Sequence, residues 1–107
     1  MSVTTKQVKP KTNSQIIKQF LSGVRSGEVN NLTIHNRVDS IALINYNTIL
    51  LEYEFHTKTL HLNKTRYSPT TSRIQGKIRS AIPYAEVKID KIEEYDNIQQ
   101  DEKYLFQ

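Results

Sequence analysis

The residues best suited to chemistry lie in the run Arg-Tyr-Ser-Pro-Thr-Thr-Ser-Arg at positions 66–73. Ser68 can cap a helix and Pro69 suits the first helical position, so we expect a helix N-terminus with free backbone N–H groups here. Such groups, together with hydroxyls and neighbouring cations, can hold a phosphate or a carboxylate. The predicted anion site consists of Ser68, Thr70, Thr71 and Ser72, flanked by Arg66 and Arg73. The alternative is a plain helix cap, because capping is far commoner than anion binding.

A wider basic stretch, residues 58–79, surrounds this helix start. Its candidate binding residues are Lys58, Lys64, Arg66, Arg73, Lys77 and Arg79, with Tyr67 among them. A predicted hairpin and helix carry these cations, so they could form one face that binds nucleic-acid backbone or an acidic protein surface. The sequence contains no helix-turn-helix, zinc-finger or aromatic RNA-binding signature. Charge therefore supports nucleic-acid contact, and motif evidence does not.

The formal net charge of +4 conceals four blocks of alternating sign along the chain. Residues 1–25 carry +5 and residues 55–85 carry +6, and neither segment contains an acidic residue. Residues 26–54 carry −3 and residues 86–107 carry −4. Blocks of this kind predict a surface potential with a direction. The alternative interpretation is that the charged blocks only form solvated surfaces that keep the protein soluble.

The histidines and paired carboxylates are weaker candidates. His56 and His61 flank a predicted hairpin, but the pattern offers them no third ligand, so we expect no metal site. Glu52 and Glu54 share one face of a predicted strand and could form a carboxylate pair, although an outer strand face is the simpler interpretation.

Composition argues against most enzyme classes. The 107 residues include no Cys, which excludes a disulfide scaffold, a thiolate zinc site, an iron–sulfur cluster and a cysteine nucleophile. Three glycines are too few for a Gly-rich phosphate loop, and no G-x-S-x-G motif is present. We therefore expect no catalytic residues, no cofactor and no enzymatic activity. A small nuclease would need metal-binding acids that the pattern does not place.

Two helices are expected from apolar residues that recur at helical spacing. The first covers about residues 13–25, with Asn13 or Ser14 as its cap. The second covers residues 69–82, with Ser68 as its cap and Pro83 at its end. The apolar stripes are Ile16, Ile17, Phe20, Leu21 and Val24 in the first helix, and Ile74, Ile78, Ala81 and Ile82 in the second.

Strands are expected where the apolar period changes to two. The alternating segments are 32–38, 40–44, 49–55, 60–62 and, as a last edge strand, 84–90. Short connections between the first four predict an antiparallel meander. Asp90 and Glu93 have capping-box spacing, which predicts a short acidic helix after the last strand.

Together these elements predict an α+β domain with a small antiparallel sheet of three to five strands and both helices packed on it. We assign residues 1–12 to a flexible basic arm, 13–98 to the domain and 99–107 to an acidic tail. Apolar runs are too short for a membrane-spanning helix, and the first residues lack the apolar stretch of a signal peptide. A cytoplasmic protein without membrane contact is expected.

Residues 44–82 resemble a short domain found in many small phage and plasmid proteins. The shared pattern is Tyr46-Asn47-Thr48, then Leu62-Asn63, then Tyr67-Ser68-x-Thr70-Thr71-Ser72, and finally Gln75 with Ile78-Arg79. The Tyr-Ser-x-Thr-Thr-Ser run is its most specific part. The function of that family is unknown, so the resemblance implies a mobile-element setting and no mechanism.

The sequence thus predicts a non-catalytic phage or mobile-element accessory protein that acts by binding. Its basic face, residues 58–79, would contact nucleic acid or a host complex that handles nucleic acid. The alternative is an inhibitor of a host defence system, of the anti-CRISPR type, that binds a host protein through its edge strand, acidic tail or basic face. The oligomeric state stays open, with a homodimer through the edge strand as one arrangement.

Overall fold

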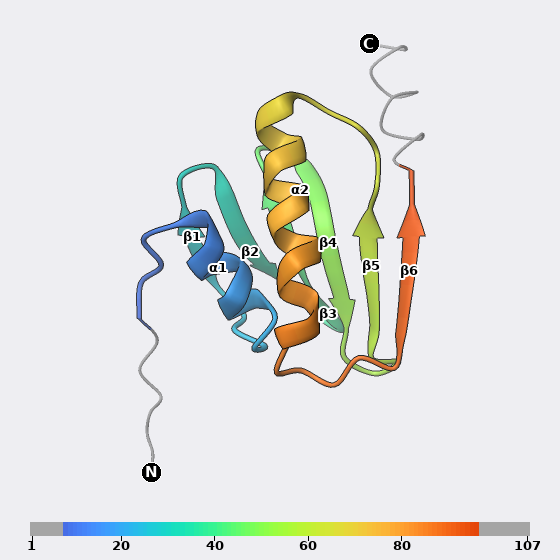
Figure 1. Ribbon diagram of the computed structural model, residues 1–107. Helices are drawn as coiled ribbons and strands as arrows, with labels where there is room; N and C mark the ends of the chain where they lie inside the picture. Colours follow the sequence, from blue (N-terminus) through green and yellow to red (C-terminus); the bar gives the residue numbers. More distant parts are fainter. Residues whose placement is uncertain (1–7, 97–107) are drawn as a thin grey trace.

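Two helices lie on one face of a six-stranded sheet in the computed structural model, which describes residues 8–96 (Figure 1). The predicted α+β class is therefore confirmed. The helices are α1, Asn13–Phe20, and α2, Pro69–Ala81, which continues into the short 3₁₀ turn η1, Ile82–Tyr84. The strands are β1, Gly27–Val29; β2, Leu32–Asn36; β3, Ser40–Asn45; β4, Thr48–Glu54; β5, Thr59–Asn63; and β6, Lys91–Tyr95.

The strands follow one another across the sheet in sequence order. Short turns join the antiparallel pairs from β1 to β5, as the predicted meander requires. The last pair differs, because β6 runs parallel to β5. A parallel pair needs a long crossover, and α2 with the segment after it supplies that connection. The sheet is therefore mixed and has one strand more than the largest number expected.

Helix α1 is shorter than predicted. Its cap is Thr12, whose hydroxyl accepts a hydrogen bond from the Gln15 N–H at 3.1 Å, in place of Asn13 or Ser14. The helix ends at Phe20, because the chain turns at Gly23, which has a φ of 89°. The Gly23 N–H donates to the Phe20 carbonyl at 3.0 Å and closes this turn. Residues 21–25 thus leave the helix that the apolar spacing predicted.

Helix α2 agrees closely with its prediction. Ser68 is the cap, Pro69 is the first helical residue, and Ile74 and Ile78 are buried against the sheet. Pro83 lies in η1, directly after the helix. The signals for this helix are local in sequence, which is why they were sufficient.

The core lies between the helices and the inner face of the sheet. The strand register places core residues of neighbouring strands opposite each other, such as Ile41 opposite Tyr53 and Leu43 opposite Leu51. A bulge in β4 adds one residue, so Leu50 and Leu51 are both buried. The other core side chains are Ile16, Ile17, Phe20, Leu21, Leu32, Ile34, Leu60, Leu62, Ile74 and Ile78.

The strand predictions are wrong at both ends of the sheet. Residues 84–90 form no strand, because the N–H groups of Glu86 and Val87 donate to the Leu21 carbonyl and hold this segment against the end of α1. The edge strand is β6, in the place of the expected acidic helix. Strand β1 was not predicted, and Val38 lies in an exposed turn after β2.

Residues 1–7 of the predicted arm and all of the predicted tail lie outside the described residues. Within the arm, the Val8 carbonyl accepts a hydrogen bond from the Gln19 side chain at 2.6 Å. Neither helix in residues 8–96 has the length and hydropathy that a membrane-spanning helix requires.

Candidate nucleic-acid interface

The fold places the helices of the two acid-free segments on one face of the sheet. Both helices come from acid-free segments, and they contact each other in one layer (Figure 1). The Lys77 ammonium donates to the Ser14 hydroxyl across their contact at 3.5 Å. We call this surface the cationic layer; its exposed basic residues are Lys11 and Lys18 from α1 and its approach, Arg73, Lys77 and Arg79 from α2, and Lys64 and Arg66 from the loop before α2.

The predicted anion site at the start of α2 is in part occupied by its own capping bonds. The Ser68 hydroxyl accepts from the Thr71 N–H at 3.3 Å and donates to the Thr71 hydroxyl at 3.3 Å. These bonds are those of an ordinary cap. Thr70 and Ser72 are exposed on the same turn. Whether an anion binds there remains a prediction.

A cleft of about 380 Å³ lies beside this turn, between α2 and the loop that precedes it. Arg66 comes from the loop and Arg79 from two turns further along α2, and both line the cleft. Its other lining residues are Asn63, Lys64, Thr65, Ser72, Gln75 and Gly76. The Ser72 hydroxyl and the Arg66 guanidinium at this open cleft are donors that a phosphodiester can use.

Buried hydrogen bonds fix the loop that carries Lys64 and Arg66. The Asn63 amide donates to the Ile49 carbonyl at 2.8 Å and to the Tyr67 hydroxyl at 3.0 Å, while its oxygen accepts from the Thr65 N–H at 2.9 Å. From α2, the Gln75 amide donates to the Asn63 and Thr65 carbonyls. The loop is therefore tied to β4 and to α2, so its cations have a defined position.

Two cations of the layer are already neutralised. Arg79 contacts Glu94 of β6 through both terminal nitrogens, at 3.3 and 3.4 Å, and Lys64 lies 3.9 Å from Asp96. The hydrogen bond from Arg79, and then its charge, lower the pKa of Glu94 below the usual glutamate range. Arg66, Arg73 and Lys77 pair with no acid in residues 8–96. These three supply the unneutralised charge of α2 and its loop.

Two predicted site residues lie apart from this group. Lys58 is in the turn between β4 and β5, at the opposite end of β5 from Lys64. Its carbonyl accepts from the Asp90 N–H at 2.8 Å, so the turn helps to start β6. Tyr67 packs against the core with its hydroxyl bonded to Asn63. The rest of the predicted basic stretch is brought together on the layer, joined by Lys18 of α1 and by Lys11 just before it, which the prediction did not include.

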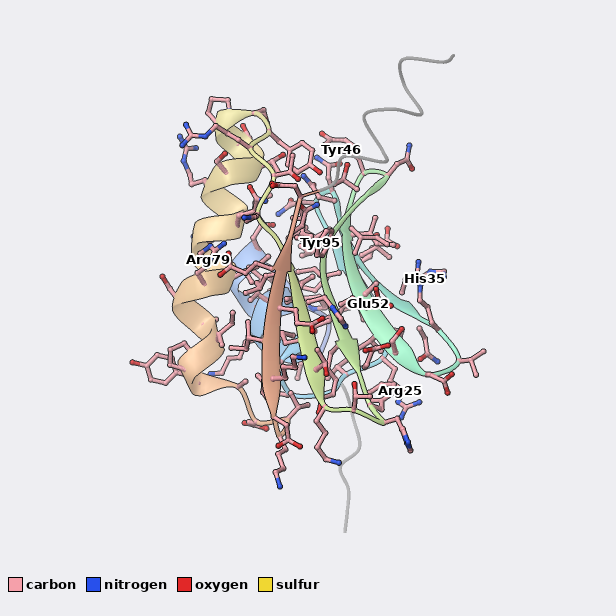
Figure 2. The ribbon with its side chains drawn as sticks, turned by 90° about the vertical axis from the view of Figure 1, so that its right-hand side faces the viewer. Arg25, His35, Tyr46, Glu52, Arg79 and Tyr95 are labelled. Atoms are coloured by element: carbon pink, nitrogen blue, oxygen red, sulfur yellow. The ribbon has the colours of Figure 1, made fainter. Side chains whose placement is uncertain are left out.

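The opposite face of the sheet is acidic and no described element covers it. Glu52, Glu54 and Glu93 project from this face, and Figure 2 shows Glu52 and His35 on the side away from Arg79 and α2. Glu52 is 3.1 Å from Arg37 and accepts from the Ser40 hydroxyl at 2.8 Å. Beside it, burial raises the pKa of Tyr95 to about 12, and the charge of Glu52 adds to that effect.

His61 lies between two carboxylates that the sequence did not connect with it. Its Nε2 is 2.9 Å from Glu54 and its Nδ1 is 3.4 Å from Glu93. The hydrogen bond from His61 is the main reason that the pKa of Glu54 is lowered. Among residues 8–96, no group of three or more such side chains has the arrangement of a metal site. Glu52 and Glu54 share a strand face as expected, but each has different partners.

A second pocket, of about 440 Å³, was missed by the sequence analysis. It lies where α1 and α2 both begin, and the turn residues Asn30, Asn31 and Tyr46 close it from the sheet side. Figure 2 shows Tyr46 at this end of the molecule. The Asn-rich turns were recognised only as turns, because nothing local indicated that they would meet.

Comparison with known proteins gives no relative for this chain. No family model, no curated protein and no solved structure matches it. The resemblance of residues 44–82 to a phage and plasmid domain therefore remains a prediction. Functional inference for this chain rests on its own geometry.

Proposed function

We propose that this protein is a non-catalytic nucleic-acid-binding protein that uses its cationic layer to contact the phosphate backbone. In the setting that the family resemblance implies, it would be a phage or mobile-element accessory protein in the host cytoplasm. The observation that carries the proposal is the meeting of two acid-free segments in one helical layer. No acidic side chain belongs to either segment, so the layer's positive potential is opposed only from outside it.

The arrangement of the cations that pair with no acid in the described part of the chain supports a polyanion over a small anion. Arg66, Arg73 and Lys77 lie along the length of α2 and its loop, and Lys18 extends the charge onto α1. Separated cations of this kind match successive phosphates, and their binding is driven by counterion release. The fixed loop at Asn63 supports the proposal further, because a positioned cation loses less side-chain and loop freedom on binding.

Salt dependence of binding tests this proposal. Fluorescence anisotropy with labelled single- and double-stranded oligonucleotides, measured at several salt concentrations, should give affinities that fall steeply as salt rises. The test variant is Arg73→Gln with Lys77→Gln. Because each lost phosphate contact removes about 0.7–0.9 from the slope of log affinity against log salt, this variant should lower the slope by about 1.5.

A matched control changes the same net charge elsewhere. Lys88→Gln with Lys91→Gln removes two cations that pair with Asp90 and Glu93 outside the layer. It should leave the slope unchanged. The proposal is wrong if no oligonucleotide binds at low salt, or if the two double variants weaken binding equally.

A second candidate function is supported by the acidic sheet face. A protein with a cationic surface could bind there, alongside the open edge of β6, which is the arrangement expected of a protein-directed inhibitor of host defence. Glu52→Gln with Glu54→Gln would then abolish binding of the captured partner, while Arg73→Gln with Lys77→Gln would not. Failure of nucleic-acid binding, together with this pattern, would favour the inhibitor.

A further inference from the structure

The pocket at the common start of α1 and α2 has a lining without charge. Its polar side chains come from separate elements: Asn13 from α1, Asn30 and Asn31 from the β1–β2 turn, Asn45 from β3 and Thr71 from α2. Leu32 and Ile74 add an apolar part. At about 440 Å³ it lies within the usual range of small-molecule sites. Such a lining suits an uncharged, partly apolar group with hydrogen-bonding edges.

Hydrogen bonds between these elements give the pocket a fixed shape. The Asn30 amide donates to the Asn13 side-chain oxygen at 2.9 Å and connects the β1–β2 turn to α1. The Asn31 amide donates to the Tyr46 hydroxyl at 2.7 Å and connects the two turns. The Asn45 amide donates to the Thr71 hydroxyl at 3.0 Å and connects β3 to α2. Because the pocket walls are already ordered, they lose little conformational entropy when a ligand binds.

Asn45 indicates what the occupant must provide. The residue is only 4% exposed, and one of its two amide N–H groups donates to the Thr71 hydroxyl. The amide oxygen accepts no hydrogen bond from residues 8–96. In that part of the chain, every side-chain polar atom that is fully enclosed has a hydrogen-bond partner. This oxygen is therefore not fully enclosed, and Asn45 lines the pocket. A ligand with an N–H donor would supply the hydrogen bond that the Asn45 amide oxygen lacks.

Tyr46 gives the pocket an aromatic wall. The residue is 71% exposed, and it adopts a φ of 56°, a left-handed conformation that bulky residues rarely take. Its hydroxyl is held by Asn31, so the ring has a fixed position although solvent surrounds it. Exposed, immobilised rings of this kind are the platforms on which proteins stack bases.

We propose that this pocket takes one unpaired nucleobase of a single strand whose backbone lies on the cationic layer. The proposal rests on the proposed function and specifies its ligand. The base would stack on Tyr46 and donate an N–H to Asn45. Two cations lie near the pocket: Arg73 follows Thr70 and Thr71 on α2, and Lys77 contacts Ser14, which follows Asn13. Phosphates that flank the base would reach these cations, which pair with no acid within residues 8–96. A free neutral sugar would satisfy the amides but would leave those cations without a role.

Abasic strands test this proposal directly. Anisotropy would compare a labelled 12-nucleotide single strand with one of equal length whose central nucleotides lack bases, and with the corresponding duplex. We expect the intact strand to bind about ten-fold more tightly than the abasic strand or the duplex, with the same salt slope as the abasic strand, because one base–aromatic stack accounts for such a difference. Equal affinity for intact and abasic strands would overturn the base pocket, and the proposed function would stand. No binding of any strand would overturn both.

Substitution of Tyr46 separates stacking from structure. Tyr46→Gly should abolish the preference for the intact strand while leaving the salt slope unchanged. It should lower the thermal midpoint only slightly, because glycine adopts a positive φ readily and the lost Asn31–Tyr46 hydrogen bond is exposed to solvent. Tyr84→Ala is the matched control, since Tyr84 is 82% exposed and lies beyond the opposite end of α2. A ten-fold preference that survives Tyr46→Gly would contradict the assigned role of this ring.

Discussion

The Arg79 guanidinium contacts the Glu94 carboxylate through two nitrogens, at 3.3 and 3.4 Å, and so joins α2 to the edge strand β6. Both side chains are more than 40% exposed, so solvent screens the pair and it adds little to stability. Its larger effect is electrostatic, because it removes one positive charge from the cationic layer.

Releasing Arg79 should therefore strengthen nucleic-acid binding. We expect Glu94→Gln to fold normally, to raise affinity several-fold at low salt and to steepen the salt slope by about 0.7–0.9, the value of one added phosphate contact. Glu28→Gln is the control, because it changes net charge equally but lies in β1, away from α2. Anisotropy measures both variants. Equal gains from the two variants would mean that net charge alone, and not position, governs binding.

Asn63 should be one of the most sensitive positions for stability. It is 2% exposed and makes three hydrogen bonds with β4 and its own loop. Asn63→Ala leaves the Ile49 carbonyl and the Thr65 N–H without these partners, so the free energy of unfolding should fall by about 2–4 kcal/mol. Urea denaturation measures this change. Asn36→Ala, at an exposed strand position, should change the free energy of unfolding by less than about 0.5 kcal/mol. Comparable losses in the two variants would mean that the hydrogen bonds of Asn63 do not hold the loop in place.

Two glycines should respond oppositely to alanine. Gly76 is inside α2, and a Cβ added there meets no atom within 4 Å, so Gly76→Ala should stabilise the fold by about 1 kcal/mol. Gly23 has a φ of 89°, and an added Cβ would lie 3.3 Å from the Val87 side chain. Gly23→Ala should therefore destabilise it. Thermal unfolding would decide, and a lower midpoint for Gly76→Ala would mean that the helix needs glycine for a reason not identified.

The carboxylates around His61 should titrate at unusually low pH. The hydrogen bond from His61 lowers the pKa of Glu54, whereas Lys91 is the main cause of the lowered pKa of Glu93. A carboxyl group whose pKa is lower in the folded state stabilises the fold above its unfolded pKa of about 4.3, and this contribution is lost as pH falls through the folded pKa. Stability should thus decline in acid below that value.

Carboxyl NMR titrations of the wild type and His61→Ala can assign this effect. The pKa of Glu54 should rise towards the usual glutamate range in the variant, while that of Glu93 should move less. An unchanged pKa of Glu54 would show that His61 is not its main hydrogen-bond donor.

The sequence was most informative where structural signals are local. Ser68, Pro69 and Pro83 define both ends of α2 within fifteen residues of each other, and the prediction was accurate. The Asp90–Glu93 spacing is equally local, but the helix that it predicted is wrong, because pairing with β5 determines the conformation of residues 91–95. That parallel partner is separated from β6 by the whole of α2, so no pattern within the segment could indicate it. The extra residue in β4 that buries Leu50 and Leu51 together likewise depends on pairing with β3.

The candidate site was predicted in part for the same reason. The basic residues that follow Asn63 lie in one continuous segment, 64–79, so their grouping could be anticipated. Lys18 of α1 joins them only because the two helices pack together. The Asn-lined pocket depends on the meeting of four segments, and each Asn in a turn already has a sufficient local explanation.

An NMR titration of the ¹⁵N-labelled full-length chain with a 12-nucleotide single strand at low salt tests the central claim most directly. We predict that the largest amide shift changes will map to α1, to residues 64–68 and to α2, and that Ala42 and Glu52 on the opposite sheet face will change little. The account is contradicted if no amide shifts at low salt, or if the changes centre on the acidic face of β3 and β4.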